Sequence, residues 1–468
     1  MQYKKQIILS ILTIFVLSAL IIGATFSYFQ AQGDTSSQTS ATVKTYTTDV
    51  FSFETGNAIS FSLNQENFTS GKGNQTGSTF AKTILTANNK TNTATEHYYL
   101  YLNISNNTFT YTQNENTPEI LLTITDGTNP VTNITSLTYK TVTDGKGNRI
   151  SGYDITNKKG LITLFSNRKI TTTSTKTENW NITVTFINYN ADQSANAGHT
   201  FSGKVLIQKE KITLLADYVI SQYTGTQGDN GIYHHESSLA NGAGDNSYRY
   251  AGANPNNFVC FGSNAATCPN ANLFRIIGVF GDKTKVIRAT SVGNQKWNTS
   301  SSNTWSSSIL NTYLNGTYLT SLGTLAEKIA TTTWKVGGNK YANISGVVPK
   351  TAYQYEVGSS ASTTTYDAKI GLMYVSDYGF ATDQSGWTTK LSSYNSNISK
   401  NWLFLGSTEW TISRDSGTTN HAFIVYGGYV LDYLVNNAMN YVRPTFNLNS
   451  SVTYVSGDGT QSNPIRIN

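Results

Sequence analysis

The sequence predicts three successive parts: an N-terminal transmembrane or signal helix, an all-β sandwich of jelly-roll type, and a C-terminal α+β domain. Three observations lead to this prediction. A long apolar run follows two lysines at the start of the chain, apolar and polar residues alternate through residues 46–208, and a helical spacing appears at residues 209–223. Because six of the seven tryptophans lie beyond that helical segment, a second core is expected to begin there.

Composition excludes several classes of protein. The 468 residues carry 33 Lys+Arg and 27 Asp+Glu, and no basic run follows Lys4 and Lys5, which argues against binding to nucleic acid. The 38 glycines show no period of three, so the chain is not collagen-like. With 7 Trp, 29 Tyr and 20 Phe, the chain has enough aromatic surface to bury a large core, which argues against disorder.

The first part, residues 1–27, is expected to direct export. An apolar run from Ile7 to Phe26 is long enough to span a bilayer and also fits a long signal peptide. Small residues at Thr25 and Ser27 would permit cleavage before Tyr28, and an uncleaved helix would instead anchor the protein in the membrane. In both cases the rest of the chain faces outward, so the expected location is extracellular, on the cell surface or in a secreted matrix. Residues 28–45 follow as a polar stalk or as the entry to the first strand.

The sandwich is expected over residues 46–208, because several segments show apolar residues on one face only. Turn residues at Asp126–Gly127 and Asp144–Gly145 separate these segments, and no helical spacing interrupts them. The alternating segments are Ile59–Leu63, Tyr98–Ile104, Ile120–Ile124 and Trp180–Phe186.

A short helix over 209–223 is expected to link the two domains, and residues 224–468 to form the α+β domain. Its first part, 224–270, is rich in Gly and Asn and reads as loops. A hairpin is expected around Gly281–Asp282 and a helical region over 304–330. The expected strands are Phe274–Phe280, Lys285–Ala289, Ala368–Val375, Trp410–Arg414, Ala422–Val430 and Tyr441–Leu448.

The two cysteines, Cys260 and Cys268, are separated by seven residues. In an exported chain such a close pair predicts one local disulfide, with free thiols as the alternative. A zinc site is not expected, because no histidine lies at ligand spacing.

The segment 23–29 (GATFSYF) resembles the export signal of camelysin/TasA-type biofilm-matrix proteins, in which a jelly-roll domain follows a similar junction. Trp180–Phe186, residues 190–193 and Phe201–Ile207 are similar to the closing strands of such modules. The resemblance covers about residues 1–208 and implies a matrix protein with a β-sandwich.

The second half resembles an uncharacterised surface-protein module of Firmicutes. The segments 410–414 (WTISR) and 441–449 (YVRPTFNLN) are also similar to C-type-lectin-like and formylglycine-generating-enzyme-like folds. That resemblance implies fold only, because the cysteine pair lies far upstream of this tail and the lectin calcium motifs are missing. The segments that resemble the Firmicutes module are 245–262, 273–280, 303–315, 410–414, 441–449 and 457–467.

Catalytic spacings are scarce. HExxH, GxSxG, Walker A and GxGxxG are absent, and Ser166-x-x-Lys169 is a chance-level match to SxxK. His234, His235 and Glu236 form either a metal ligand set or a solvated loop, and the latter is preferred, so no metal is expected.

Calcium is the one cofactor that the loops leave open. Asp229, Asp245 and Asp282 lie in Gly-rich loops, but without the ligand spacing of a calcium loop. We therefore expect no cofactor, with Ca²⁺ as the alternative.

Three side chains are candidates for either a structural or a ligand-facing role. Arg414 and Arg443 lie within otherwise apolar strands, and Trp410 belongs to the same tail. Aromatic residues near 297–318 and 387–410 either pack in the core or form a surface on which sugars stack.

The sequence thus predicts an exported bacterial cell-surface or biofilm-matrix protein, non-catalytic, with an adhesin-like C-terminal module. Its expected partner is a glycan or a protein on a host or neighbouring cell. A fibre-forming matrix subunit and a secreted hydrolase remain as alternatives.

Overall fold

The computed structural model describes residues 39–44, 49–68, 72–87, 93–438 and 440–468, with side chains from residue 49 onward. Residues 1–27, which are expected to direct export and include Thr25 and Ser27, lie outside the described residues, as do Tyr28 to residue 38 and residue 45 of the expected stalk. Among the residues described, no helix is both long and apolar enough to cross a bilayer. The chain divides into two compact units, Met1–Lys211 and Ile212–Asn468, and the structure is mostly β-sheet.

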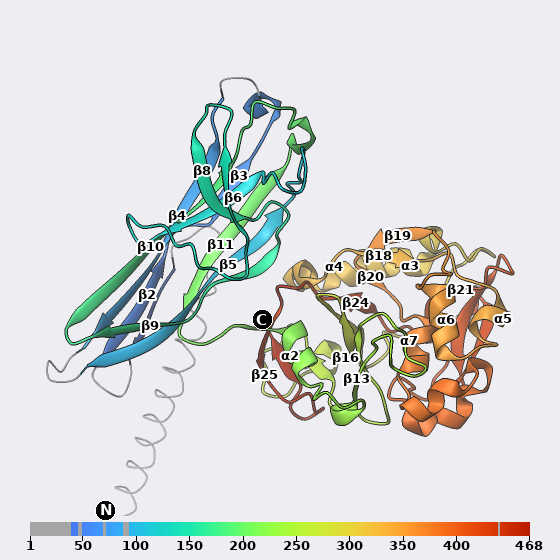
Figure 1. The fold of residues 1–468 in the computed structure, drawn as a ribbon. Helices are drawn as coiled ribbons and strands as arrows, with labels where there is room; N and C mark the ends of the chain where they lie inside the picture. The colour runs from blue at the N-terminus through green and yellow to red at the C-terminus, as the bar shows by residue number, and fades with distance from the viewer. Residues whose placement is uncertain (1–38, 45–48, 69–71, 88–92, 439) are drawn as a thin grey trace, which may run out of the picture. The chain divides into compact units, whose positions relative to one another are not determined.

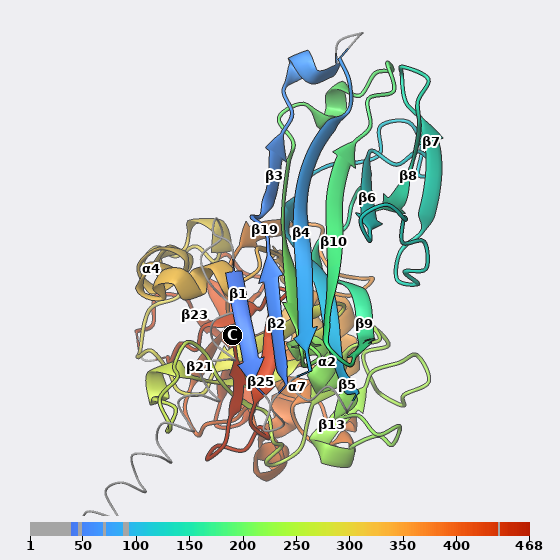
Figure 2. The same cartoon turned by 90° about the vertical axis from the view of Figure 1, so that its left-hand side faces the viewer.

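The first unit is a β-sandwich of two antiparallel sheets (Figures 1 and 2). The long strands β4 and β10 lie side by side in the larger sheet. In sheet order, the seven strands of that sheet are β1 (Thr39–Lys44), β2 (Val50–Thr55), β4 (Gln75–Thr86), β10 (Thr175–Phe186), β6 (Ile120–Thr125), β8 (Arg149–Asp154) and β7 (Tyr139–Thr143). The four strands of the smaller sheet are β3 (Ile59–Ser62), β11 (Thr200–Gln208), β5 (Ala94–Asn107) and β9 (Gly160–Thr172).

One apolar core lies between these sheets, and the alternating pattern of the sequence builds it. Trp180, Ile182, Val184 and Phe186 of β10 are buried, together with the alternating residues of β5 from the opposite sheet. The predicted sandwich is confirmed. Strand β1 lies within the segment expected to be a stalk or strand entry, and its pairing with β2 favours the strand entry over residues 39–44.

The second unit combines short helices with several sheets and begins with β12 (Thr213–Leu214) and α2 (Leu215–Ser221). The helix is shorter than the expected 209–223, because residues 213–214 pair with β25 instead of continuing a helix. Its largest sheet follows the order β12, β25 (Thr453–Ser456), β26 (Ile465–Ile467), β15 (Phe258–Cys260), β16 (Leu273–Phe280), β17 (Lys283–Arg288), β24 (Thr445–Asn447) and β20 (Ile370–Gly371). At its side, β14 (Tyr248–Tyr250) pairs with both β13 (Ile232–His234) and β16.

Two smaller sheets and a set of short helices complete this unit (Figure 1). The smaller sheets are β18 (Thr332–Lys335) with β19 (Thr365–Ala368), and β21 (Glu409–Arg414) with β22 (His421–Tyr426) and β23 (Tyr429–Leu434). The α-helices are α3 (Ile309–Tyr313), α4 (Leu319–Ser321), α5 (Tyr341–Ile344), α6 (Pro349–Glu356) and α7 (Val375–Phe380). Among the remaining helical turns are Asp229–Gly231, Gln384–Thr388 and Leu391–Lys400.

Two strands expected in the second unit are interrupted in the structure. The expected strand Ala422–Val430 is a hairpin, β22–β23, because Gly427 and Gly428 adopt φ of 54° and 93°. The strand expected over Ala368–Val375 ends at Gly371, and Val375 begins α7.

The helical region expected over 304–330 and the last expected strand differ from expectation in length. The hairpin around Gly281–Asp282 is confirmed, and the helical region 304–330 consists of short helical pieces. The last expected strand shortens to β24, since Pro444 precedes it.

Candidate ligand-binding site

An open pocket of about 390 Å³ lies in the second unit, between the loop that precedes β13 and the loop that follows β14. Its lining is mostly polar, with three asparagines, one tyrosine and one aspartate. The lining residues are Gly228, Asn230, Gly231, Tyr233, Ala251, Gly252, Ala253, Asn254, Pro255, Asn256 and Asp383.

Left-handed backbone positions shape the first loop. Gly228, Asn230 and Gly231 have φ of 88°, 55° and 70°, a region that glycine and asparagine tolerate best. A side chain at Gly231 would meet Pro255 at 2.8 Å, so glycine there allows the two loops to approach closely. The Gly231 carbonyl accepts a hydrogen bond of 2.8 Å from the Ala251 amide and joins the loops.

Two buried tryptophans, Trp387 and Trp402, contact the residues that form the pocket. Tyr233 packs edge-on against Trp387, with ring centroids 5.1 Å apart. The indole of Trp402 donates to the Tyr250 carbonyl at 2.8 Å, and its backbone amide donates to the Gly252 carbonyl at 3.0 Å. Since both tryptophans are buried, they fix the loop and leave Tyr233 as the aromatic ring of the pocket.

Arg275, on β16, donates hydrogen bonds to the loop that carries Asn254 and Asn256. Its guanidinium donates to the carbonyls of Pro255 and Trp402, both at 3.2 Å, and to Oδ1 of Asn257 at 2.7 Å. It also lies over the ring of Trp402, 4.5 Å from the centroid. Burial and the nearby Arg443 lower the pKa of Arg275 to about 9, so this side chain is charged at neutral pH.

A smaller hollow of about 40 Å³ shares Asn230 and Asn256 with the pocket and is therefore its neighbour. Tyr218 lines it and stacks on Tyr454 at 3.8 Å. Asp458 also lines it, and hydrogen bonds from Thr460 lower the pKa of this carboxyl, which keeps it ionised.

The pocket itself holds one carboxylate, Asp383. Its Oδ1 accepts a hydrogen bond of 2.5 Å from Ser385, and its Oδ2 lies 3.6 Å from Nζ of Lys400. Burial and the charge of Asp383 raise the pKa of Tyr233, so its hydroxyl stays protonated and can donate. The site therefore presents amide, hydroxyl and carboxylate groups around one aromatic ring.

The structure places Arg414, Arg443 and Trp410 away from this pocket. Arg443 is buried and donates to Glu409 and to the Leu403 carbonyl, both at 2.7 Å. Arg414 donates to the carbonyl of Gly337, and the buried Trp410 to that of Gln295. These contacts favour the structural alternative for all three side chains.

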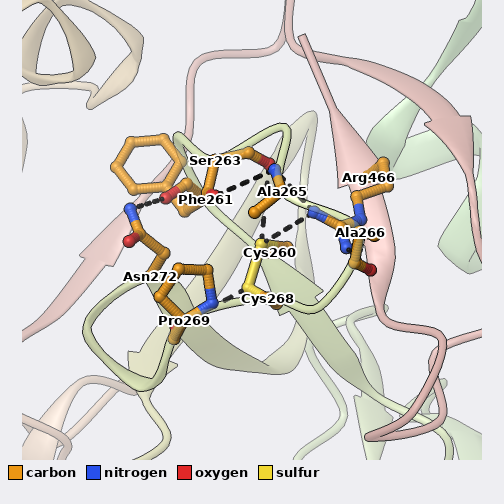
Figure 3. The surroundings of a disulfide bond; sticks show 9 residues. All are labelled: Cys260, Phe261, Ser263, Ala265, Ala266, Cys268, Pro269, Asn272 and Arg466. Carbon is orange, nitrogen blue, oxygen red and sulfur yellow. Dashed lines mark hydrogen bonds between the residues drawn. A yellow bond between two sulfur atoms is a disulfide. The ribbon is translucent and has the colours of Figure 1, made fainter.

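Cys260 and Cys268 form the predicted disulfide, with Cα atoms 5.9 Å apart (Figure 3). Arg466 of β26 covers it: its guanidinium lies 3.2 Å from Sγ of Cys260 and donates to the carbonyls of Ser263 and Ala266. The disulfide and this arginine hold the 261–267 loop, which does not line the pocket.

The acidic loop residues have protein partners. Asp245 binds Ser247 and Arg249, Asp229 accepts from Thr224, and Asp282 lies 3.6 Å from Lys283. Within the described part of the chain, no three His, Cys, Asp or Glu side chains are grouped as metal ligands.

The histidines of the predicted metal alternative are also engaged within the protein. His235 is buried and its Nδ1 accepts from the Ala243 amide, whereas His234 stacks on Tyr248. Nδ1 of His421 lies 2.5 Å from Oδ2 of Asp432 across the β22–β23 hairpin.

Sequence reasoning missed the residues that line the pocket. The Gly- and Asn-rich composition of 224–270 was a usable signal, because it marks left-handed turns that can bring loops together. Of the two alternatives for the aromatic residues near 297–318 and 387–410, packing in the core holds for the tryptophans, since every tryptophan there is buried.

Comparisons with known proteins give no relative: no family model, no curated protein and no solved structure matches this chain.

Proposed function

We propose that the protein is an exported, non-catalytic cell-surface or biofilm-matrix protein whose C-terminal unit binds a glycan in the pocket beside Tyr233. The polar lining of that pocket is the observation that supports this most directly. Most pockets for drug-like ligands are predominantly apolar, and this one instead offers three asparagine amides and a carboxylate.

A sugar matches this chemistry. Each hydroxyl of a sugar both donates and accepts, and so does each asparagine amide. Asn254 and Asn256 are exposed on a loop that Arg275 holds in place, so little loop ordering is needed on binding. Tyr233 supplies a partly exposed ring that can face the apolar side of a sugar ring.

The finer fold assignments are part of this proposal. Consecutive strands β2 to β6 and β9 to β11 alternate between the two sheets of the sandwich, as in a jelly roll. In the second unit, the Trp410 amide donates to the Tyr441 carbonyl, and Arg443 reaches Glu409. These contacts join the WTISR and YVRPTFNLN segments in one core, as the likeness to C-type-lectin-like folds implies.

Export is proposed from two features. The apolar run after Lys4 and Lys5 has the length of a signal peptide or membrane anchor. The Cys260–Cys268 disulfide is of a kind that persists in oxidising compartments.

The test is titration of the full chain against a panel of soluble oligosaccharides and polysaccharides. The double variant Asn254→Ala/Asn256→Ala should weaken binding roughly tenfold, because two hydrogen-bonding amides are lost. Asn264→Ala is the matched control, since Asn264 is also exposed but lies in the disulfide loop.

Equal affinity of both variants would overturn the assignment of the site. Absence of binding to every glycan would overturn the function itself. Release of new reducing ends from a bound polysaccharide would instead indicate the hydrolase alternative.

The fibre-forming alternative has one observation in its favour. Strands β1 and β7 end the larger sheet of the sandwich, and each leaves one edge without a partner among the described residues. Electron micrographs of the concentrated protein would show fibres if these edges pair between molecules, and single particles otherwise.

A further inference from the structure

A buried lysine and a buried aspartate meet inside the second unit, away from the pocket. Nζ of Lys285, on β17, contacts Oδ2 of Asp377, in the first turn of α7. The carboxyl of Glu356, the final residue of α6, lies close enough to act on the charge of Lys285. All three side chains are at most 5% exposed.

The surroundings of the lysine are aromatic. Its Nζ lies 4.8 Å from the ring centroid of Tyr374, 5.5 Å from that of Phe280 and 5.7 Å from that of Trp334. An ammonium ion is poorly solvated there, and burial lowers the pKa of Lys285 despite the neighbouring Asp377. A lower pKa makes loss of the ammonium proton easier, and the neutral amine that results is the nucleophilic form of lysine.

Both carboxyl groups are held in fixed positions at the first turn of α7. Asp377 accepts from the Tyr374 amide at 2.8 Å, while Glu356 accepts from the amides of Val375 and Ser376 at 2.9 and 2.7 Å. The Ser413 hydroxyl also donates to Oε1 of Glu356, and burial raises the pKa of this carboxyl.

We propose that Lys285 and Asp377 join in an intramolecular amide, an isopeptide bond that ties β17 to α7. The proton of the ammonium first passes to the aspartate, which gives a neutral amine beside a carboxylic acid. The Nζ lone pair attacks Cγ of Asp377, the N–C bond forms and the C–OH bond breaks. The hydroxyl leaves with a proton from the nitrogen as one water molecule, and no oxidant or cofactor is consumed. Glu356 relays that proton.

Arg249 is the other cation near Asp377, but it lies farther from this carboxylate than Lys285 does and is not the attacking group. Its Nη1 lies 3.9 Å from Oδ1 of Asp377, whereas its Nη2 lies 2.6 Å from Asp245. A guanidinium stays protonated and does not act as a nucleophile here. Arg249 instead stabilises the negative charge that develops on the Asp377 oxygens during attack.

The decisive measurement is peptide mapping of the full-length native protein by tandem mass spectrometry after reduction, alkylation and tryptic digestion. An amide at Lys285 blocks cleavage after this residue. The expected product is a branched peptide in which 284–288 is joined to 370–390, with the summed mass less one water. Separate peptides 284–285, 286–288 and 370–390, with no branched product, would overturn the proposal.

Two variants test the assigned roles. Glu356→Gln keeps both reacting groups but removes the proton relay, so the branched peptide should fall at least tenfold relative to the wild type. Lys285→Arg retains the positive charge but cannot form the amide. Any branched peptide assigned in this variant therefore measures the rate of false assignments. Undiminished branched peptide in Glu356→Gln would remove Glu356 from the mechanism.

Discussion

The two units of the chain bury charge in different ways. In the described part of the sandwich, the buried charged side chains are carboxylates: Glu119, Asp144 and Asp154. Neutral groups satisfy much of their hydrogen-bonding capacity. Glu119, for example, accepts from the Thr112 amide at 3.0 Å and from the side chain of Gln193.

The second unit buries cations as well. Arg249, Arg275 and Arg443 are each at most 7% exposed, and two of them pair with a carboxylate. Arg275 is the exception, since its acceptors are carbonyl and amide oxygens.

This difference follows from how each unit is built. Long strands with one apolar face build the sandwich core by repetition, and its buried carboxylates lie at or next to the ends of strands. The second unit is built from short strands, short helices and loops. Many loop carbonyls have no partner in a sheet, and long buried side chains such as Arg275 donate hydrogen bonds to them. A buried ion pair contributes little net stability, but it penalises every arrangement that separates its partners.

The largest effect should come from breaking one such pair. Glu409→Ala leaves the Arg443 guanidinium buried without its carboxylate and should cost the second unit about 3–5 kcal/mol. Calorimetry of the full chain should show the transition of the second unit shifting to lower temperature, with the sandwich transition unchanged.

Two controls sharpen this test. Glu54→Ala removes the exposed Lys82–Glu54 pair of the sandwich and should cost no more than about 1 kcal/mol. Replacing both partners, Glu409→Leu with Arg443→Met, should regain part of the lost stability. Equal costs for Glu409→Ala and Glu54→Ala would contradict the contrast between the units.

A smaller effect is expected from acid. Burial favours a higher pKa for Asp245, but Arg249 and the hydrogen bonds from Ser247 outweigh it, and the pKa lies below its ordinary range. Stability from this group is present above the unfolded pKa of about 4 and is lost as the pH falls through the folded pKa. The stability gap between wild type and Asp245→Asn should narrow by about 1–2 kcal/mol on acidification below pH 4.

Urea unfolding of both proteins at several acidic pH values measures that gap. A gap that stays constant with pH would mean that Asp245 contributes through packing and not through its charge.

The smallest effect should come from the sandwich. Glu178 accepts hydrogen bonds from Tyr98 at 2.6 Å and from Arg168 at 2.9 Å. Glu178→Ala should cost about 1 kcal/mol, because Tyr98 still accepts from the Trp180 indole and Arg168 still lies over that ring. Chemical denaturation checks this value, and a loss as large as that of Glu409→Ala would show that both units depend on ion pairs equally.

The same contrast explains what the sequence could predict. The strands of the sandwich were visible because one face of each is buried, as in Trp180–Phe186. In the second unit, β16 is buried from Leu273 to Val279 on both faces, so it shows no alternation and only its length indicates a strand. The disulfide followed from two cysteines and a short spacing.

The residues of the candidate site could not be predicted from the sequence. Asp383 reaches the pocket from a segment more than a hundred residues after Tyr233, and no local pattern records that approach. Lys285 and Asp377 are 92 residues apart along the chain, and each resembles an ordinary surface residue until the fold buries it. The loop glycines alone indicated where chain segments come close.

The pairing of β12 with β25, and of β26 with β15, sets the order in which the second unit can assemble. Strand β26 lies between β25 and β15, so β12, with which the unit begins, joins the sheet only after residues 453–467 are present. During synthesis, residues 212–452 therefore stay incompletely folded until the last strands have emerged, whereas the sandwich can close as soon as β11 has emerged. The second unit is consequently the part of the chain most in need of a chaperone and most exposed to proteases before completion.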